Sequence, residues 1–221
     1  MGLFGGDGSD DPSARRESMV ADLRERGRVT DEAVQSAMAT VPRHAFVPEQ
    51  HRDRSYADRT LSIGEGQTIS APHMVGIMAE LLSLSPGQRV LEVGTGCGYH
   101  AAVTAELVGA DGVYSVEYHD SLAEQARERL GELGYGGISI RVGDGHDGWP
   151  EHAPYDRAYL TCAPATLPDR VLDQLRPGGR IVAPVGRGQQ ELVVATKRDD
   201  GSLDRRTNGG VRFVPMVGGE E

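Results

Sequence analysis

Three glycines within five positions mark the stretch LEVGTGCGYH, residues 91–100, which follows a short apolar run. Glycine permits a positive φ and lets a ligand approach the main chain closely, which a Cβ would prevent. Residues 89–93 suit a buried strand, and residues 101–107 suit a helix. A strand, a glycine turn and a helix together predict a nucleotide-type ligand loop. Its glycines are Gly94, Gly96 and Gly98.

Carboxylates follow or end the predicted strands around this loop. Glu117 ends the second strand, 23 positions after Gly94, where such folds place an acid that accepts hydrogen bonds from two ribose hydroxyls. Asp144 lies between two glycines at the end of the third strand, where a carboxylate and nearby main chain can contact an adenine edge. A simple Asp-Gly turn is the alternative for Asp144.

The spacing of the glycines bears on which nucleotide the loop holds. The dinucleotide fingerprint is G-x-G-x-x-G, whereas Tyr99 stands here where the last glycine belongs. Glu92, just before the loop, would face a cationic ligand or hydrogen-bond the loop itself. A dinucleotide brings a pyrophosphate, but S-adenosylmethionine brings a positive sulfonium and no phosphate. A looser glycine pattern among carboxylates therefore favours S-adenosylmethionine and a methyltransferase.

The elements that must position these residues alternate along the chain. Apolar β-branched runs are followed by stretches with helical spacing, and this alternation predicts an α/β fold with a doubly wound, mostly parallel sheet and helices on both faces. The expected strands beyond the first lie within 112–118, 137–145, 155–163 and 178–186, and the helices within 121–133 and 167–175. The tail predicts a hairpin around 198–202 and a last extended piece.

The N-terminal part predicts a helical extension. A helix is expected from Ser13 to Gly27, and Thr30 is a candidate N-cap for a second helix. The polar loop 49–66 is long enough to form part of a site. A single domain is expected, made of a disordered tail (1–12), N-terminal helices with a substrate-side loop (13–66) and a core (67–221).

The stretch QTISAPHMVGIMAELLSL begins another predicted helix. Ser70 can act as its N-cap, and Pro72 needs no N–H partner in the first turn. Because the N-terminal end of a helix attracts anions, its N–H groups form a candidate anion site.

Composition excludes several classes of protein. A net charge of −10 argues against nucleic-acid binding. No apolar run is long enough to span a membrane, no leader pattern is present, and two cysteines make no disulfide framework. A soluble, cytoplasmic monomer is expected. The seven histidines lack the spacing of a metal site, so no metal is expected.

Several motifs together resemble one family. VPRHAFVP, GQTISAPHMV, LEVGTGCGYHAAVTAEL, VGDGHDGW, APYDRAYLTCAP, LPDRVLDQLRPGGRIVAPVG and VRFVPMV occur in the order and spacing of protein-L-isoaspartate O-methyltransferases. The match runs from about residue 19 to residue 217. The glycine loop alone would suit most methyltransferases, but QTISAPHM with VPRHAFVP and FVPMV is specific to this family.

This resemblance implies an activity and a set of site residues. The family transfers the methyl group of S-adenosylmethionine to the α-carboxylate of L-isoaspartyl residues in damaged proteins or peptides, and the ester collapses to a succinimide. The substrate-side serine falls on Ser70, and His73 is expected to lie in the cleft. Residues that should line the cleft before Ser70 are Gln67, Thr68 and Ile69. Cofactor positions carried over are Glu92, Gly94, Gly96, Gly98, Glu117, Asp144 and Gly145.

The expected chemistry needs no general base. A carboxylate with a pKa near 4 is already ionised at pH 7, so positioning should dominate catalysis. Two alternatives remain open at this stage: a methyltransferase that acts on an aspartate of one dedicated peptide, and an S-adenosylmethionine-binding adaptor without turnover.

Overall fold

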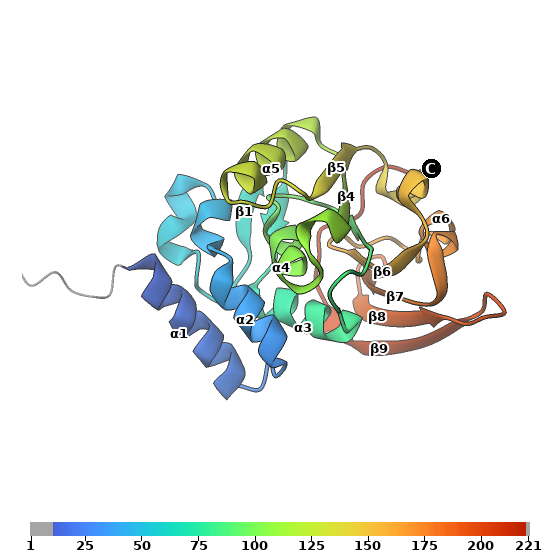
Figure 1. Cartoon of the computed structure of the whole chain (residues 1–221), viewed down its shortest axis with the longest axis horizontal. Coiled ribbons are helices and arrows are strands. Elements are labelled where there is room, and N and C mark those ends of the chain that lie inside the picture. The colour runs from blue at the N-terminus through green and yellow to red at the C-terminus, as the bar shows by residue number, and fades with distance from the viewer. Residues whose placement is uncertain (1–10, 220–221) are drawn as a thin grey trace, which may run out of the picture.

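A seven-stranded sheet forms the centre of the protein in the computed structural model, which describes residues 11–219 (Figure 1). Its order is β5-β4-β3-β6-β7-β8-β9. Neighbours from β5 to β7 run parallel, whereas β8 and β9 are added antiparallel. The α/β fold with a mostly parallel sheet is therefore confirmed. The strands are β3 (Val90–Val93), β4 (Val113–Glu117), β5 (Ser139–Val142), β6 (Tyr155–Leu160), β7 (Leu175–Val185), β8 (Gln190–Lys197) and β9 (Leu203–Val211).

Helices cover both faces of this sheet. Successive residues of β3 point to opposite faces, so Val90 packs in one hydrophobic cluster and Leu91 and Val93 in another. The first cluster contains apolar residues from α3 (Pro72–Leu82), α4 (Tyr99–Val108) and α5 (Asp120–Glu132), and the second contains Val171 of the short α6 (Asp169–Asp173). Among residues 11–219, no helix combines the length and apolar character needed to cross a bilayer.

Two N-terminal helices form an extra layer over α3 and α4. Figure 1 shows α1 (Pro12–Glu25) outside α2 (Glu32–Thr40), which packs on α3 and α4. Residues 1–10 of the expected tail (1–12) lie outside the described residues. Asp11 is the N-cap of α1, so the helix begins before the predicted end of the tail. The prediction that Thr30 caps the second helix was wrong. Asp31 caps α2 instead, since its Oδ1 accepts the Val34 N–H, and Thr30 donates its N–H and hydroxyl to the Glu80 carboxylate of α3.

The predicted polar loop 49–66 contains regular structure. A 3-10 helix (Glu49–Arg54) is followed by the antiparallel hairpin of β1 (Leu61–Gly64) and β2 (Gln67–Ile69). The turn of this hairpin has a positive φ at Gly64, Glu65 and Gly66. The hairpin was missed because β1 and β2 are only four and three residues long, too short for alternation to stand out.

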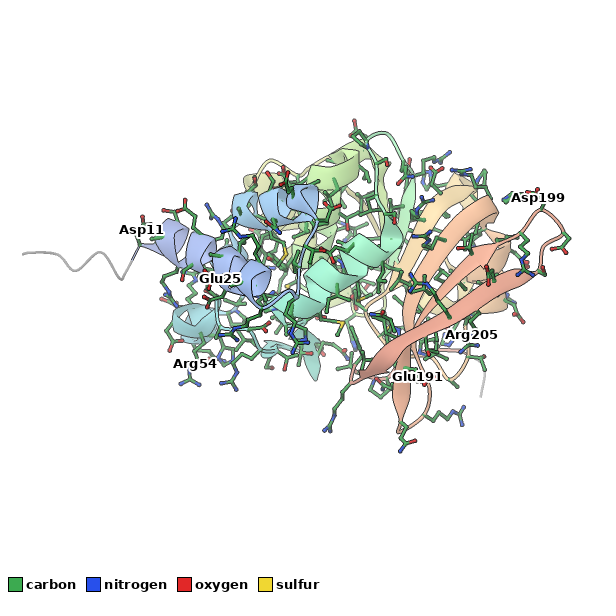
Figure 2. All side chains as sticks on the ribbon, turned by 90° about the horizontal axis from the view of Figure 1, so that it is seen from below. Asp11, Glu25, Arg54, Glu191, Asp199 and Arg205 are labelled. Atoms are coloured by element: carbon green, nitrogen blue, oxygen red, sulfur yellow. The ribbon has the colours of Figure 1, made fainter. Side chains whose placement is uncertain are left out.

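The C-terminal segment returns to the sheet. The predicted hairpin around 198–202 is the connection between β8 and β9, and Figure 2 places Asp199 at its tip, far from Asp11. After β9 the chain runs beside the end of β6. Ala163 N–H donates to the Val214 carbonyl at 2.8 Å, and Met216 N–H donates to the Ala163 carbonyl at 2.9 Å. The last residues thereby reach the carboxyl ends of the parallel strands.

The two candidate caps of α2 can be told apart by stability. Asp31 Oδ1 accepts the Val34 N–H at 3.0 Å, so Asp31→Ala should lower the free energy of unfolding by about 1 kcal/mol. Thr30→Ala is the matched control and should cost much less, because its N–H contact to Glu80 remains. Urea denaturation of both variants measures the difference, and equal losses would contradict the assignment of Asp31.

Candidate active site

A cavity opens at the carboxyl ends of β3, β4 and β6. The chain order reverses between β3 and β6, and ligands of open α/β sheets bind at such a switch point. Most of the lining comes from five segments: 67–70, 93–97, the end of β4, the residues after β6, and the tail from Val214 to Val217. Val75, Tyr99, His100 and Gly145 complete it. Eight of the predicted site residues are among the lining residues: Gln67, Thr68, Ile69, Ser70, Gly94, Gly96, Glu117 and Gly145.

The glycine loop brings bare backbone to this cavity. Gly94 has φ +95° and Gly96 has φ +53°, both in the left-handed region that suits glycine. A Cβ on Gly94 would lie 2.3 Å from the Thr161 hydroxyl oxygen, so no other residue fits there without a shift. Gly98 is the N-cap of α4 and packs against Leu130 of α5, away from the cavity lining. Gly98 therefore allows α4 and α5 to approach each other closely.

Glu117 lies at the end of β4 with its carboxylate fixed by backbone donors. One oxygen accepts the Gly96 N–H at 2.8 Å, and the other accepts the His119 N–H at 3.0 Å. The residue is 5% exposed and lines the cavity. Because a carboxylate offers about four acceptor sites, each oxygen can still accept a hydroxyl. This geometry can hold a vicinal diol.

Glu92 lies behind the cavity wall and does not line it. Its two oxygens accept hydrogen bonds from Ser115 on β4 and from Tyr159 on β6. Further hydrogen bonds join the Ser115 hydroxyl to Thr95 in the glycine loop and the Tyr159 hydroxyl to Thr104 on α4. Glu92 therefore acts on the loop through hydroxyl groups.

Two buried titratable groups in this region are held uncharged. Burial, with a smaller contribution from the nearby Glu117, raises the pKa of Glu92 to about 8, although the hydrogen bonds from Ser115 and Tyr159 act in the opposite direction. Burial also lowers the pKa of His100 to about 3. His100 lines the cavity, and its ring lies against the Tyr159 ring with centroids 4.4 Å apart and planes tilted by 35°.

The Asp144 carboxylate accepts hydrogen bonds from residues around it. Its Oδ1 accepts the N–H and the ring Nδ1 of His146, each at 2.8 Å, and its Oδ2 accepts the Gly219 N–H. Asp144 does not line the cavity, whereas Gly145 does. A Cβ on Gly145 would lie 2.3 Å from Val93 Cγ1. The turn that Asp144 holds thus presents the Gly145 backbone to the cavity.

Ser70 precedes α3 but does not cap it, which corrects the expected N-cap. The N-cap residue is Ala71, and no side chain caps the helix from that position. The expected anion site at the helix N–H groups was also wrong, because these donors are taken. His73 N–H donates to Asp58 at 3.0 Å, and the Met74 and Val75 N–H groups donate to the Ala71 carbonyl. The Ser70 hydroxyl is left for a ligand.

A second cavity meets the first at Ser70. It is lined by residues of β2 and α3 and by the segment from Gly210 to Val214. His73 lines this second cavity, and its Nδ1 lies 2.7 Å from Asp58 Oδ1. The residues that line both cavities are Thr68, Ser70, Thr161 and Val214. Ser70 therefore stands at the junction between a cavity lined by the glycine loop and one that opens toward β9.

Sequence reasoning missed several groups around Ser70. Arg43 donates to the Ser70 carbonyl, and Asp58 accepts from His73. Both come from the N-terminal segment. The motif VPRHAFVP contains Arg43, but nothing in it indicates that the side chain contacts Ser70, 27 positions away. Within residues 11–219, no group of three or more His, Cys, Asp or Glu side chains could hold a metal ion.

Several known proteins with similar sequences or structures share one description. A model of the family protein-L-isoaspartate(D-aspartate) O-methyltransferase matches residues 14–221. Protein-L-isoaspartate O-methyltransferase 2 of Archaeoglobus fulgidus is 49% identical, covering 94% of this chain and 95% of its own. Protein-L-isoaspartate O-methyltransferase of Methanopyrus kandleri is 52% identical, covering 93% of this chain and 92% of its own. A solved protein-L-isoaspartate O-methyltransferase superposes with a TM-score of 0.85 at 30% identity, covering 92% of this chain and 66% of that one.

The two uncharged groups predict how stability depends on pH. Between pH 4.5 and 8 only the folded state keeps the Glu92 proton, so the free energy of unfolding falls as pH rises. Between pH 3 and 6.5 only the unfolded state protonates His100, which gives the opposite slope. The two slopes oppose each other between pH 4.5 and 6.5, which leaves a net fall from 6.5 to 8.

Glu92→Gln should remove this alkaline fall, because the amide does not titrate. Urea denaturation at half-unit steps from pH 6.5 to 8 measures the slope. The control is Glu124→Gln on the exposed face of α5, which should keep the slope of the unsubstituted chain. An unchanged slope in Glu92→Gln would contradict a protonated Glu92.

Proposed function

This chain belongs to the protein-L-isoaspartate(D-aspartate) O-methyltransferase family, and from that premise we propose how its cleft carries out the reaction. The enzyme transfers a methyl group from S-adenosylmethionine to the α-carboxylate of L-isoaspartyl residues in damaged proteins. The cavity lined by the glycine loop holds the methyl donor, and the cavity toward β9 takes the peptide. The observation that carries this assignment is Ser70, which lines both cavities.

The residues of the first cavity suit S-adenosylmethionine. The Glu117 oxygens, fixed by Gly96 and His119 N–H groups, would accept the two ribose hydroxyls. Gly94, Gly96 and Gly145 provide backbone that a ligand can approach closely, and Asp144 holds the turn that places Gly145 toward the adenine. Gly98 begins α4 beside the loop.

No phosphate is expected at this cavity. In residues 11–219, none of the ion pairs brings an arginine or lysine to Glu92 or Glu117. Glu117, the glutamate that lines this cavity, suits a cationic ligand better than a pyrophosphate. Glu92 supports the loop through Ser115 and Thr95.

The reaction requires placement of the substrate carboxylate. S-adenosylmethionine, when bound, supplies a methyl group whose carbon–sulfur bond breaks as a carboxylate oxygen bonds to the carbon. The carboxylate is already ionised at neutral pH, so no side chain has to remove a proton. The Ser70 hydroxyl would donate to one oxygen and leave the other free to attack. Gln67, Thr68, Ile69 and His73 line the cleft on either side of Ser70.

The test of this function is a comparison of two peptides. We expect an L-isoaspartyl peptide to be methylated far faster than the same peptide with normal aspartate, because the position of the main chain beside the carboxylate sets the attack distance. Base-labile methyl ester, followed with labelled S-adenosylmethionine, measures both rates. Equal rates would contradict the repair function and favour a methyltransferase for aspartate in a dedicated peptide. Binding without any turnover would favour an adaptor.

Substitutions at Ser70 and Glu117 should affect different steps. Ser70→Ala should lower single-turnover methylation by roughly 10²-fold, as loss of a positioned donor does, while S-adenosylmethionine affinity stays unchanged. Its stability should also stay unchanged, because Ser70 does not cap α3. Glu117→Ala is the counterpart and should weaken S-adenosylmethionine binding by on the order of 2–3 kcal/mol in calorimetry. A fully active Ser70→Ala enzyme would remove Ser70 from the mechanism.

A further inference from the structure

Arg43 is a buried cation with no counter-ion in the described part of the chain. It opens a 3-10 helix (Arg43–Phe46) and is 0% exposed. Arginine is almost never fully buried unless it is paired. Yet no ion pair within residues 11–219 includes Arg43. Burial lowers the pKa of Arg43, but a guanidinium stays protonated in proteins. A positive charge therefore lies inside the fold.

Its partners are main-chain oxygens and one ring. Nη2 donates to the Ser70 carbonyl and Nε to the Ser55 carbonyl, both at 2.7 Å. The guanidinium carbon lies 4.7 Å from the centroid of the Tyr99 ring, whose face attracts cations. Nη1 is buried and has no hydrogen-bond partner among the residues that the structure describes. The two carbonyl dipoles and the Tyr99 ring offset only part of the free-energy cost of burying the guanidinium charge.

This charge lies directly behind the proposed substrate position. Ser70 and Tyr99 both line the first cavity, and both contact Arg43. Asp58 is the carboxylate whose charge acts on Arg43, but it already holds the N–H and ring of His73. An anion beside Ser70 would therefore supply charge that the surrounding protein does not.

We propose that Arg43 is a positioning residue for the substrate carboxylate. It holds the Ser70 main chain at the junction of the two cavities, and its unpaired charge draws the isoaspartyl carboxylate to that junction. The inference rests on the proposed function, because the substrate is what carries the carboxylate. In a poorly solvated interior this attraction is stronger and less screened than at the surface.

Substitution of Arg43 should separate peptide binding from donor binding. We expect Arg43→Gln to raise KM for the isoaspartyl peptide by about tenfold or more, with S-adenosylmethionine affinity within about twofold of the unsubstituted chain. Arg43→Lys keeps the charge, but a lysine ammonium group lacks the planar set of donors with which the guanidinium contacts both carbonyls. The KM of this variant should therefore be intermediate. A merely structural role would not give this order at constant donor affinity.

Arg157 provides a matched control at the other end of α3. Its Nε donates to the Leu82 carbonyl at 2.6 Å and its Nη2 to the Ser83 carbonyl at 3.3 Å, which are contacts of the same kind. Arg157→Gln should leave KM for the peptide unchanged. If Arg43→Gln also leaves peptide KM and kcat unchanged, the inference is overturned. If the unsubstituted chain itself does not methylate the peptide, the proposed function fails, and the inference fails with it.

A measurement on the unsubstituted chain covers the case in which Arg43 variants do not fold. The chain saturated with S-adenosylhomocysteine is titrated with the isoaspartyl peptide and with the same peptide carrying an α-carboxamide in place of the free α-carboxylate. An unpaired buried cation predicts about tenfold or more tighter binding of the charged peptide. Equal affinities in calorimetry would overturn the inference even if methylation of the isoaspartyl peptide is observed.

Discussion

The buried Glu92 carboxyl joins the three strands and the helix on which the cleft depends. Through Ser115 and Tyr159 it connects β3 to β4 and β6, and the same hydroxyl chain reaches the glycine loop and α4. All these groups are 4% exposed or less, so each hydrogen bond is formed away from water and its loss would leave a buried polar atom unpaired. The backbone of the loop is thereby fixed before any ligand arrives.

Much of the fold and part of the candidate site could be predicted from local sequence. Strands such as β3 and β4 are short apolar runs flanked by turn residues, and Glu117 falls at a strand end whose direction the sheet fixes. Gly94 and Gly96 were predicted for the same reason, since the constraint on them is the φ of their own residue. Where a residue acts through its own backbone or its own strand, sequence is sufficient.

The rest could not be predicted because it depends on partners far along the chain. Thr30 and Ser70 have residue types that are common at N-caps. Thr30 instead donates hydrogen bonds to Glu80 of α3, and at the start of α3 it is Asp58 that accepts the His73 N–H. Asp144 is held in part by Gly219, 75 positions away. Arg43 showed no role in its own motif because its hydrogen-bond partners are the carbonyls of Ser55 and Ser70.

The net charge of the whole chain is negative, whereas the charge buried behind Ser70 is positive. A net charge of −10 repels an anionic substrate at long range, but salt screens that repulsion beyond a Debye length of about 10 Å at 0.1 M. Arg43 is fully buried beside Ser70, so its field is screened far less than that of surface carboxylates. Surface charge can therefore change without altering the attraction at the junction of the cavities. Placing the cation inside the fold separates recognition of the carboxylate from the acidic surface.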